Sequence, residues 1–337
     1  MSKVDIAAVV LWSAVTLYAI FAGADFGAGL WDLIAGGAER GERPRALIDR
    51  VLTPVWEANH VWLIFMLVVT WTAFPEAFGP IMSTLFVPLS LAALGIVLRG
   101  SGFAFRHIVR GLPGRRALGA TFALSSVVTP FFLGTVAGAI ATGRVPAEGA
   151  GDRLTSWFNI TSLAIGVLLV ATCAYIAAVF LVTEARRAGD EELERYFRTR
   201  ALVAAVVAGG VATLALVLLN EHASALFDGL VGGSGLPLVI LSALCGIGAI
   251  VQLLRRGRGT RVLAAGALAA VVFGWGAAQW PDMLPGELTL DQAAAPPATL
   301  DALLVVFVAA LLIVVPALVL LYTLQQRHLL GEGEEPG

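Results

Sequence analysis

The sequence predicts an all-α polytopic membrane protein. Of its 337 residues, 58% are hydrophobic and only 14% are charged, and the mean hydropathy is +0.86. A soluble globular domain is about a quarter charged, so this chain has too little polar surface to face water on all sides. Its apolar residues come in long runs rather than in short alternating segments, which indicates bundled helices rather than the strands of a barrel.

The apolar runs predict nine membrane-spanning helices. A bilayer core about 30 Å thick requires about 20 mostly apolar residues in a helix that crosses it. Stretches of this kind run over residues 6–33, 52–74, 78–99, 117–142, 157–183, 201–220, 236–254, 262–280 and 301–323. We interpret the first as a retained helix rather than a signal peptide, because its positive charges follow the apolar run instead of preceding it.

Three polar segments join or follow these stretches. Residues 184–200 mix acids and arginines at helical spacing, which predicts a solvated helix extension. Residues 281–300 are interrupted by prolines and are predicted to form an external loop. Residues 324–337 end in Gly-Glu-Gly-Glu-Glu-Pro-Gly, which is too polar to fold, so a disordered cytoplasmic tail is predicted there.

The basic residues predict the orientation, because cytoplasmic loops are enriched in Arg and Lys. All but three of the 22 basic residues follow the first, third, fifth and seventh stretches or lie in the tail, within 40–50, 99–116, 186–200 and 255–261 and at Arg327. The other side carries only Lys3, Arg144 and Arg153. The sequence therefore predicts an external N-terminus and a cytoplasmic C-terminus.

Two carboxylates lie inside the predicted helices, where ionisable residues are costly and become functional candidates. Asp25 belongs to the first stretch and Glu57 opens the second, so the orientation places both in the cytoplasmic half of the membrane. His60 shares a helix face with Glu57, and Asn59 is its neighbour. A carboxylate entered from the cytoplasm, with an imidazole and an amide beyond it, predicts a proton path through Glu57, Asp25, His60 and Asn59.

Structural explanations for the same residues stay open. Asp25 could cap a broken helix or hydrogen-bond to a neighbouring one. The dipole of a helix N-terminus would by itself account for Glu57, and His60 could be a satisfied packing residue. Glycines at i and i+4, namely Gly23 with Gly27 and Gly134 with Gly138, predict close helix packing.

The composition also excludes several classes of function. The net charge is −2 and no basic run is present, which argues against nucleic-acid binding. There is no phosphate-binding glycine loop and no zinc-spaced Cys or His pair; Cys173 and Cys245 lie in apolar runs. Haem requires axial His, Met or Cys ligands, and His60 is the only histidine in a predicted span. No metal or cofactor is therefore expected to be bound by this chain alone.

Several motifs together resemble a known family. The first stretch contains Gly23-Ala24-Asp25-Phe26-Gly27-Ala28-Gly29, and the second opens with a Pro-x-Trp-acid-x-Asn-x-x-Trp signature at Pro54, Trp56, Glu57, Asn59 and Trp62. Further motifs are Gly102-Phe103-Ala104-Phe105-Arg106, Thr129-Pro130-Phe131-Phe132-Leu133-Gly134 and Trp275-Gly276-Ala277-Ala278-Gln279-Trp280-Pro281. With them the sequence resembles subunit II of the cytochrome bd-type quinol oxidases. It differs at Glu57, where the family more commonly has Asp, at Ala58, where Gly is usual, and at His60, where an acid or amide is usual; such differences are typical of a divergent branch.

The resemblance implies a fold and a role. The fold would be two four-helix bundles, over 1–142 and 143–280, followed by the loop at 281–300 and a peripheral helix at 301–323. The chain would be a haem-free subunit II packed against a homologous subunit I that carries two b-type haems and one d-type haem. Together they would oxidise quinol and reduce O₂ to water, generating a membrane potential without pumping. The carboxylate that opens helix 2 is associated with the cytoplasmic proton path, which corresponds to Glu57.

The resemblance also implies the setting of the protein. Its partners would be subunit I, small accessory subunits and membrane lipid, and its location the cytoplasmic membrane of a bacterium or archaeon. Two other functions stay open: a proton-coupled secondary transporter, since intramembrane carboxylates are typical of transporters, and an assembly scaffold without a proton role. A transporter should show internal repeats, and none is convincing between the first four spans and the next four.

Overall fold

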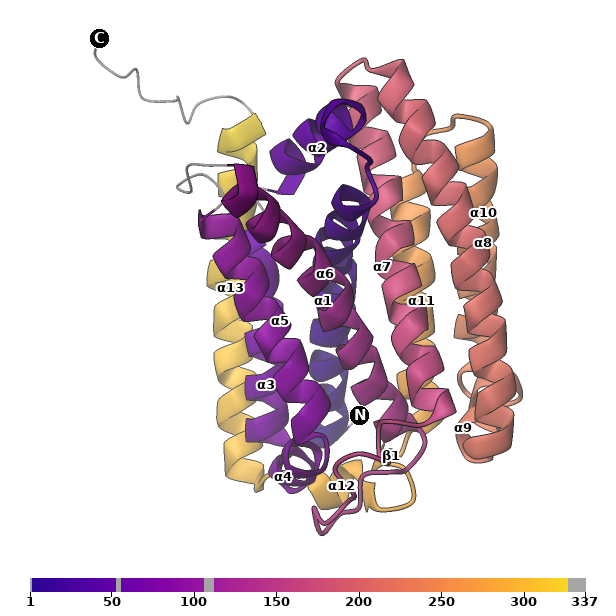
Figure 1. The fold of residues 1–337 in the computed structure, drawn as a ribbon. Coiled ribbons are helices and arrows are strands. Elements are labelled where there is room, and N and C mark those ends of the chain that lie inside the picture. The colour runs from indigo at the N-terminus through magenta and orange to yellow at the C-terminus, as the bar shows by residue number, and fades with distance from the viewer. Residues whose placement is uncertain (1, 53–55, 106–111, 327–337) are drawn as a thin grey trace.

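The structure is a computed structural model that describes residues 2–52, 56–105 and 112–326. These residues form a long helical assembly with one short β-hairpin at one end (Figure 1). The helices are α1 (Lys3–Leu33), α2 (Ala38–Leu52), α3 (Trp56–Ala73), α4 (Pro75–Thr84), α5 (Phe86–Phe105), α6 (Leu112–Ala141), α7 (Ile160–Arg187), α8 (Glu191–His222), α9 (Ser224–Val231), α10 (Leu236–Leu254), α11 (Thr260–Gln279), α12 (Leu290–Ala293) and α13 (Pro297–Gln326). The strands are β1 (Asp282–Leu284) and β2 (Leu288–Thr289).

Helices occupy the described parts of all nine predicted stretches. Within the described residues, α1, the Gly119–Ala141 part of α6, α7, α8, α10 and α11 are long and apolar enough to cross a membrane. The bent pair α4–α5 would be a seventh span, and the shorter apolar helices His60–Ala73 and Pro297–Ile313 correspond to the second and ninth stretches. The structure thus supports six to seven spans, while the count of nine stays a prediction.

The third stretch is not one continuous helix as the sequence predicted. It begins in α4 and continues into α5, with an 84° bend between Pro75–Thr84 and Phe86–Gly102. Pro88 has no N–H to donate to the carbonyl of Thr84, and a continuous helix would require that hydrogen bond. The helix also does not end at residue 99, since α5 continues to Phe105. Arg99 therefore belongs to the helix and not to the loop in which the sequence placed it.

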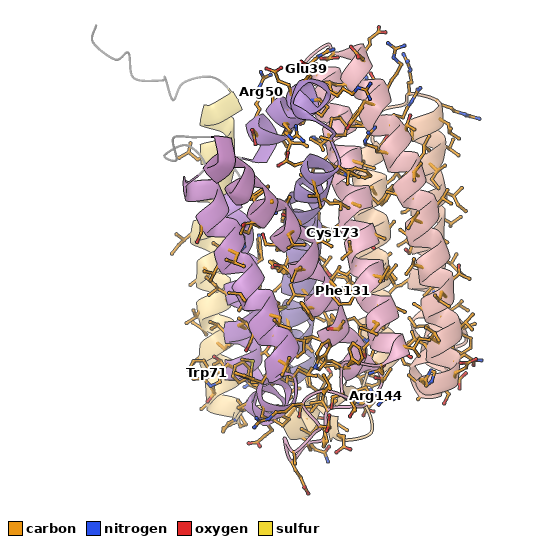
Figure 2. All side chains as sticks on the ribbon, viewed as in Figure 1. Glu39, Arg50, Trp71, Phe131, Arg144 and Cys173 are labelled. Carbon is orange, nitrogen blue, oxygen red and sulfur yellow. The ribbon has the colours of Figure 1, made fainter. Side chains whose placement is uncertain are left out.

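The arginine-rich segments gather at one end of the assembly. Arg43 of α2 is 2.7 Å from the carboxylate of Asp190, which precedes α8. Arg186 of α7 donates to the carbonyl of Gly257, in the turn between α10 and α11, at 2.8 Å. Figure 2 shows Arg50 at this end and Arg144 at the opposite end. Arg43, Arg50 and Arg186 thus lie at one end and Arg144 at the other, and which end is cytoplasmic stays a prediction.

The predicted helix extension at 184–200 is divided between the end of α7 and the start of α8, which meet at a corner. Helix α7 ends at Arg187, and Gly189 adopts a φ of +70° in the turn before α8. Glycine reaches this left-handed conformation without a steric penalty. Asp190 then caps α8, because its side chain accepts hydrogen bonds from the backbone N–H groups of Glu192 and Leu193. The acids and arginines of the segment therefore belong to two helix ends.

The predicted loop at 281–300 is folded. Strands β1 and β2 pair antiparallel, and Thr289 starts α12 with a capping box completed by Gln292. The backbone N–H of Ala295 donates to the carbonyl of Ala73 at 2.8 Å, which fixes the segment to the end of α3. Helix α13 then begins at Pro297 and runs to Gln326, so the first residues of the predicted tail are helical, and 327–337 lie outside the described residues.

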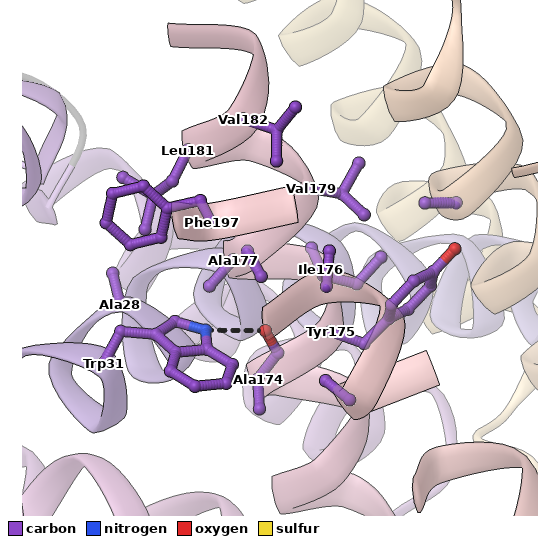
Figure 3. Packing of buried hydrophobic residues seen from close by; sticks show 14 of the residues in the cluster. Ala28, Trp31, Ala174, Tyr175, Ile176, Ala177, Val179, Leu181, Val182 and Phe197 are labelled. Atoms are coloured by element: carbon purple, nitrogen blue, oxygen red, sulfur yellow. Dashed lines mark hydrogen bonds between the residues drawn. The ribbon is translucent and has the colours of Figure 1, made fainter. Parts of the chain in front are cut away.

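Helix α7 lies at the centre of the assembly, against α1, α6 and α8. Its contact with α1 includes a hydrogen bond of 2.8 Å from Trp31 Nε1 to the carbonyl of Ala174, beside the buried residues Ala28 and Ala177 (Figure 3). Small residues at this surface allow the backbones to approach, so dispersion contacts replace a hydrophobic driving force that a bilayer does not provide. Helix α1 also packs on α3, α6 and α11, and the division into two bundles stays a prediction.

Candidate functional site

A buried ion pair joins α1 and α5. Arg99 Nη2 lies 2.6 Å from Asp25 Oδ1 and donates a second hydrogen bond, at 3.0 Å, to the backbone carbonyl of Asp25. Both side chains are completely buried. Asp25 therefore does bind a neighbouring helix, which was one of its structural explanations, and its partner is a full positive charge.

Helix α6 and two aromatic rings complete the surroundings of Arg99. The other terminal nitrogen, Nη1, donates to Ser126 Oγ of α6. The guanidinium carbon lies 4.3 Å from the ring centroid of Phe122 and 5.1 Å from that of Phe26, within the range of cation–π attraction. A Cβ at Gly29 would collide with Ser126 Oγ and with Arg99 Nη1, so glycine at this position leaves the room that the guanidinium occupies.

The ion pair limits what Asp25 can do. An arginine stays protonated in a protein, and among the described residues Asp25 is the carboxylate paired with Arg99. Asp25 Oδ1 and the backbone carbonyl of Asp25 both accept from Arg99, so Asp25 Oδ2 is the oxygen left for a further hydrogen bond.

Several polar atoms near the pair have no hydrogen-bond partner among the described residues. They are Asp25 Oδ2, Arg99 Nε and the hydroxyl of Tyr18, each buried. Tyr18 lies on α1 in a cluster with Ala22, Phe26 and Cys173. Buried polar groups in proteins nearly always bind a protein group or an ordered water, so this region has unused hydrogen-bonding capacity inside an otherwise apolar bundle.

The other predicted path residues open α3. This helix begins at Trp56, which puts Glu57 in its first turn and Asn59 in the same stretch. The side chains of Trp56, Glu57 and Asn59 lie outside the part of the chain that the structure describes, and so does Pro54. His60 is half-buried. The prediction that Glu57, His60 and Asn59 share a path with Asp25 stays a prediction.

Trp62 shows which part of α3 lies level with the ion pair. It packs against the cluster of Tyr18, Ala22, Phe26 and Cys173, and α1 and α3 are neighbouring helices. Glu57 precedes Trp62 by about 7.5 Å of helical rise. The first two turns of α3 therefore run beside the part of α1 that carries Asp25.

The glycines of α1 differ in what surrounds them. A Cβ at Gly27 would collide with the backbone carbonyl of Cys173, whereas one at Gly23 would meet Cys173 Sγ at an ordinary 3.6 Å. On α6, a Cβ at Gly134 would come within 2.7 Å of Gly166, and one at Gly138 within 2.6 Å of Ser162. Close backbone approach to α7 thus depends on Gly27, Gly134 and Gly138.

Among the described residues, no group of three or more His, Cys, Asp or Glu side chains could hold a metal ion. His222 Nδ1 lies 3.0 Å from the carbonyl of Leu218 and 3.3 Å from Thr161 Oγ1, while His107 and His328 are outside the described residues. We therefore derive no step through a cofactor bound to this chain.

Arg99, Ser126 and Tyr18 are the residues that sequence reasoning missed. Arg99 was assigned to a loop because a span of ordinary length ends there, although the small and apolar residues after it, Gly100 to Phe105, allow the helix to continue. A buried carboxylate usually pairs with a cation, and Arg99 is the arginine that lies at the very end of a predicted span. Nothing in the sequence distinguishes Ser126 or Tyr18 from ordinary packing residues.

The apolar helices, the ion pair inside them and the segregated basic residues define a multi-pass α-helical membrane protein. The chain belongs to the cytochrome bd terminal oxidase subunit II family, whose sequence profile matches residues 4–325. Membership makes it a subunit of a terminal oxidase, an oxidoreductase complex in which a subunit I partner holds the haems.

Individual relatives agree with this membership. The chain is 24% identical over 324 residues to a Bacillus subtilis (strain 168) protein assigned as a cytochrome bd menaquinol oxidase subunit II, with 92% of each chain covered. It is 25% identical over 226 residues to the cytochrome bd ubiquinol oxidase subunit 2 of the same organism, covering 66% of this chain and 64% of that one. A chain of the bd oxidase from Geobacillus thermodenitrificans superposes with a TM-score of 0.75 at 28% identity, covering 96% of this chain and 98% of that one.

Proposed function

We propose that this chain is the haem-free subunit II of a quinol-oxidising cytochrome bd-type oxidase in the cytoplasmic membrane of a bacterium or archaeon. The family match over residues 4–325 carries the proposal. The names of the relatives include menaquinol and ubiquinol, so a quinol is the proposed electron donor.

We further propose that the chain supplies a proton path from the cytoplasm. Reduction of O₂ to water consumes protons, and taking them from the cytoplasm while quinol releases its own outside generates a potential without pumping. Glu57 is the proposed entry, because it lies in the first turn of α3, the helix that directly follows the arginine-bearing α2. His60 and Asn59 continue the path, and Asp25, which is paired with Arg99, accepts hydrogen bonds along it.

The composition of the purified complex tests the first proposal. The tagged chain, extracted from its native membrane, should co-purify with one larger polypeptide and show the optical absorbance of b- and d-type haems. The same chain expressed without that partner should be colourless and should not consume O₂ with quinol. A colourless, monomeric protein from the native membrane would contradict the proposal and favour a transporter.

Substitution of Glu57 tests the proton path. Glu57→Gln keeps the shape and hydrogen-bonding capacity but cannot ionise, so O₂ consumption per haem should fall by about 10²–10⁴-fold, the usual loss for a positioned acid–base group. Glu57→Asp should keep much of the activity. Glu39→Gln, at an exposed acid of α2, is the matched control and should be unchanged. Full turnover in an assembled Glu57→Gln complex would contradict a role of Glu57 in proton transfer. Loss of assembly instead of turnover would favour the alternative function, an assembly scaffold.

A further inference from the structure

Tyr18 is a buried residue that the proposed function does not use. It lies midway along α1, its side chain is 7% exposed, and its hydroxyl has no hydrogen-bond partner among the described residues. Around it are Ala22, Phe26 and Cys173, with Trp62 of α3 and Leu169 of α7 against the cluster. A buried tyrosine hydroxyl usually finds a partner, and none of these neighbours provides one.

Tyr18 shares a helix face with Asp25. The two residues are seven positions apart, which is about two helical turns and about 10 Å of rise. Phe26, the residue after Asp25, lies in the same buried cluster as Tyr18. Asp25 is nearer the arginine-rich end of α1 and Tyr18 is nearer its middle, so a path that passes the ion pair reaches Tyr18 next.

The unpartnered atoms of this region are complementary. Asp25 Oδ2 can only accept hydrogen bonds when ionised, Arg99 Nε can only donate, and the Tyr18 hydroxyl can do both. Asp25 Oδ2 and Arg99 Nε belong to one ion pair but do not bond to each other, and Tyr18 lies about two helical turns along α1 from Asp25. Water donates and accepts, and it is the usual ligand of buried polar groups that lack a protein partner.

We propose that Asp25 Oδ2, Arg99 Nε and the Tyr18 hydroxyl bind a short chain of water molecules, along which Tyr18 relays protons from the level of the ion pair to the middle of the membrane. This rests on the proposed proton path and extends it by one residue. The Tyr18 oxygen accepts a proton from the water on the Asp25 side as its own proton passes to the next acceptor, so the phenol is neutral before and after. The ion pair of Asp25 and Arg99 orients the water.

A pair of matched substitutions tests the relay. Tyr18→Phe removes only the hydroxyl. Tyr175→Phe removes the hydroxyl of another buried tyrosine, 8% exposed and likewise without a partner among the described residues, but in the separate cluster around Trp31. In the assembled complex, Tyr18→Phe should lower O₂ consumption per haem by about 10²-fold or more and should increase the solvent deuterium isotope effect. Tyr175→Phe should change neither, and both variants should keep their haem content.

The outcomes separate this inference from the proposed function. If Glu57→Gln slows turnover and Tyr18→Phe does not, the relay is overturned and the proton path stands. If neither slows turnover, both are wrong, and equal slowing in Tyr18→Phe and Tyr175→Phe would also overturn the relay. Should Tyr18→Phe fail to assemble, a map of the unsubstituted complex at water-resolving resolution decides. Water within hydrogen-bond distance of Asp25 Oδ2 and of the Tyr18 hydroxyl is expected, and a dry site would overturn the relay.

Discussion

Arg99 of α5 and Asp25 of α1 form an ion pair of 2.6 Å in which neither side chain is exposed. Removing two charges from water is expensive, and their attraction offsets that cost only when further hydrogen bonds satisfy the remaining polar atoms. Here the backbone carbonyl of Asp25 and Ser126 Oγ accept two of those bonds. The pair therefore fixes how α1, α5 and α6 meet.

Breaking this pair from one side should be more harmful than removing it. Arg99→Met leaves the Asp25 carboxylate buried without its counter-charge, which should cost about 3–5 kcal/mol. Asp25→Asn combined with Arg99→Met leaves no buried charge and should recover part of that loss. The thermal midpoint and the yield of the assembled complex measure this, and a double-mutant cycle gives the coupling. A double variant as unstable as the sum of both single variants would contradict the pairing.

Two glycines on one helix should respond differently to the same substitution. Gly27→Ala places a methyl group against the backbone carbonyl of Cys173 and forces α1 away from α7, so it should destabilise the chain by about 1–3 kcal/mol. Gly23→Ala places a methyl group 3.6 Å from Cys173 Sγ, an ordinary contact, and should be close to neutral. Thermal unfolding of both variants checks the contrast. Equal losses would mean that the helices do not approach most closely at Gly27.

The corner between α7 and α8 should lose stability in acid. The backbone N–H of Leu193 and the guanidinium of Arg43 lower the pKa of Asp190 below its ordinary value of 3.8. A carboxyl group with a lowered folded-state pKa contributes stability that is fully present above the unfolded value and is lost as the pH falls through the folded value. The contribution of Asp190 should therefore be constant from pH 7 to about 5 and decline below about pH 4.

Asp190→Asn isolates this effect from helix capping. Asparagine still caps α8 but cannot pair with Arg43 as a charge. The variant should be less stable than the unsubstituted chain at pH 7, and the difference should shrink toward pH 3. Thermal midpoints measured over this range check the prediction, and a difference that does not change with pH would assign the stabilisation to the cap alone.

The sequence predicted what depends on local composition. A helix in lipid must be long and apolar, so the runs of such residues mark helices such as α7 and α10 within a few residues. Segregation of the basic residues likewise predicted that Arg50 and Arg144 lie at opposite ends, as Figure 2 shows. Features that depend on contacts between residues far apart in the sequence could not be predicted from it. The ion pair joins residues 74 positions apart, and the length expected of a span placed Arg99 in a loop although α5 continues beyond it.

Labelling of introduced cysteines should establish which end faces the cytoplasm, on which the role of Glu57 depends. Ala188 and Asp291 are both exposed, the first in the turn between α7 and α8 and the second in α12 near the opposite end. In intact cells, a membrane-impermeant maleimide should label Asp291→Cys and should reach Ala188→Cys only after the membrane is permeabilised. Cys245→Ala is the background for both, because Cys245 is partly exposed while Cys173 is buried. The reverse pattern would invert the orientation and place Glu57 at the external end, where a path from the cytoplasm cannot begin.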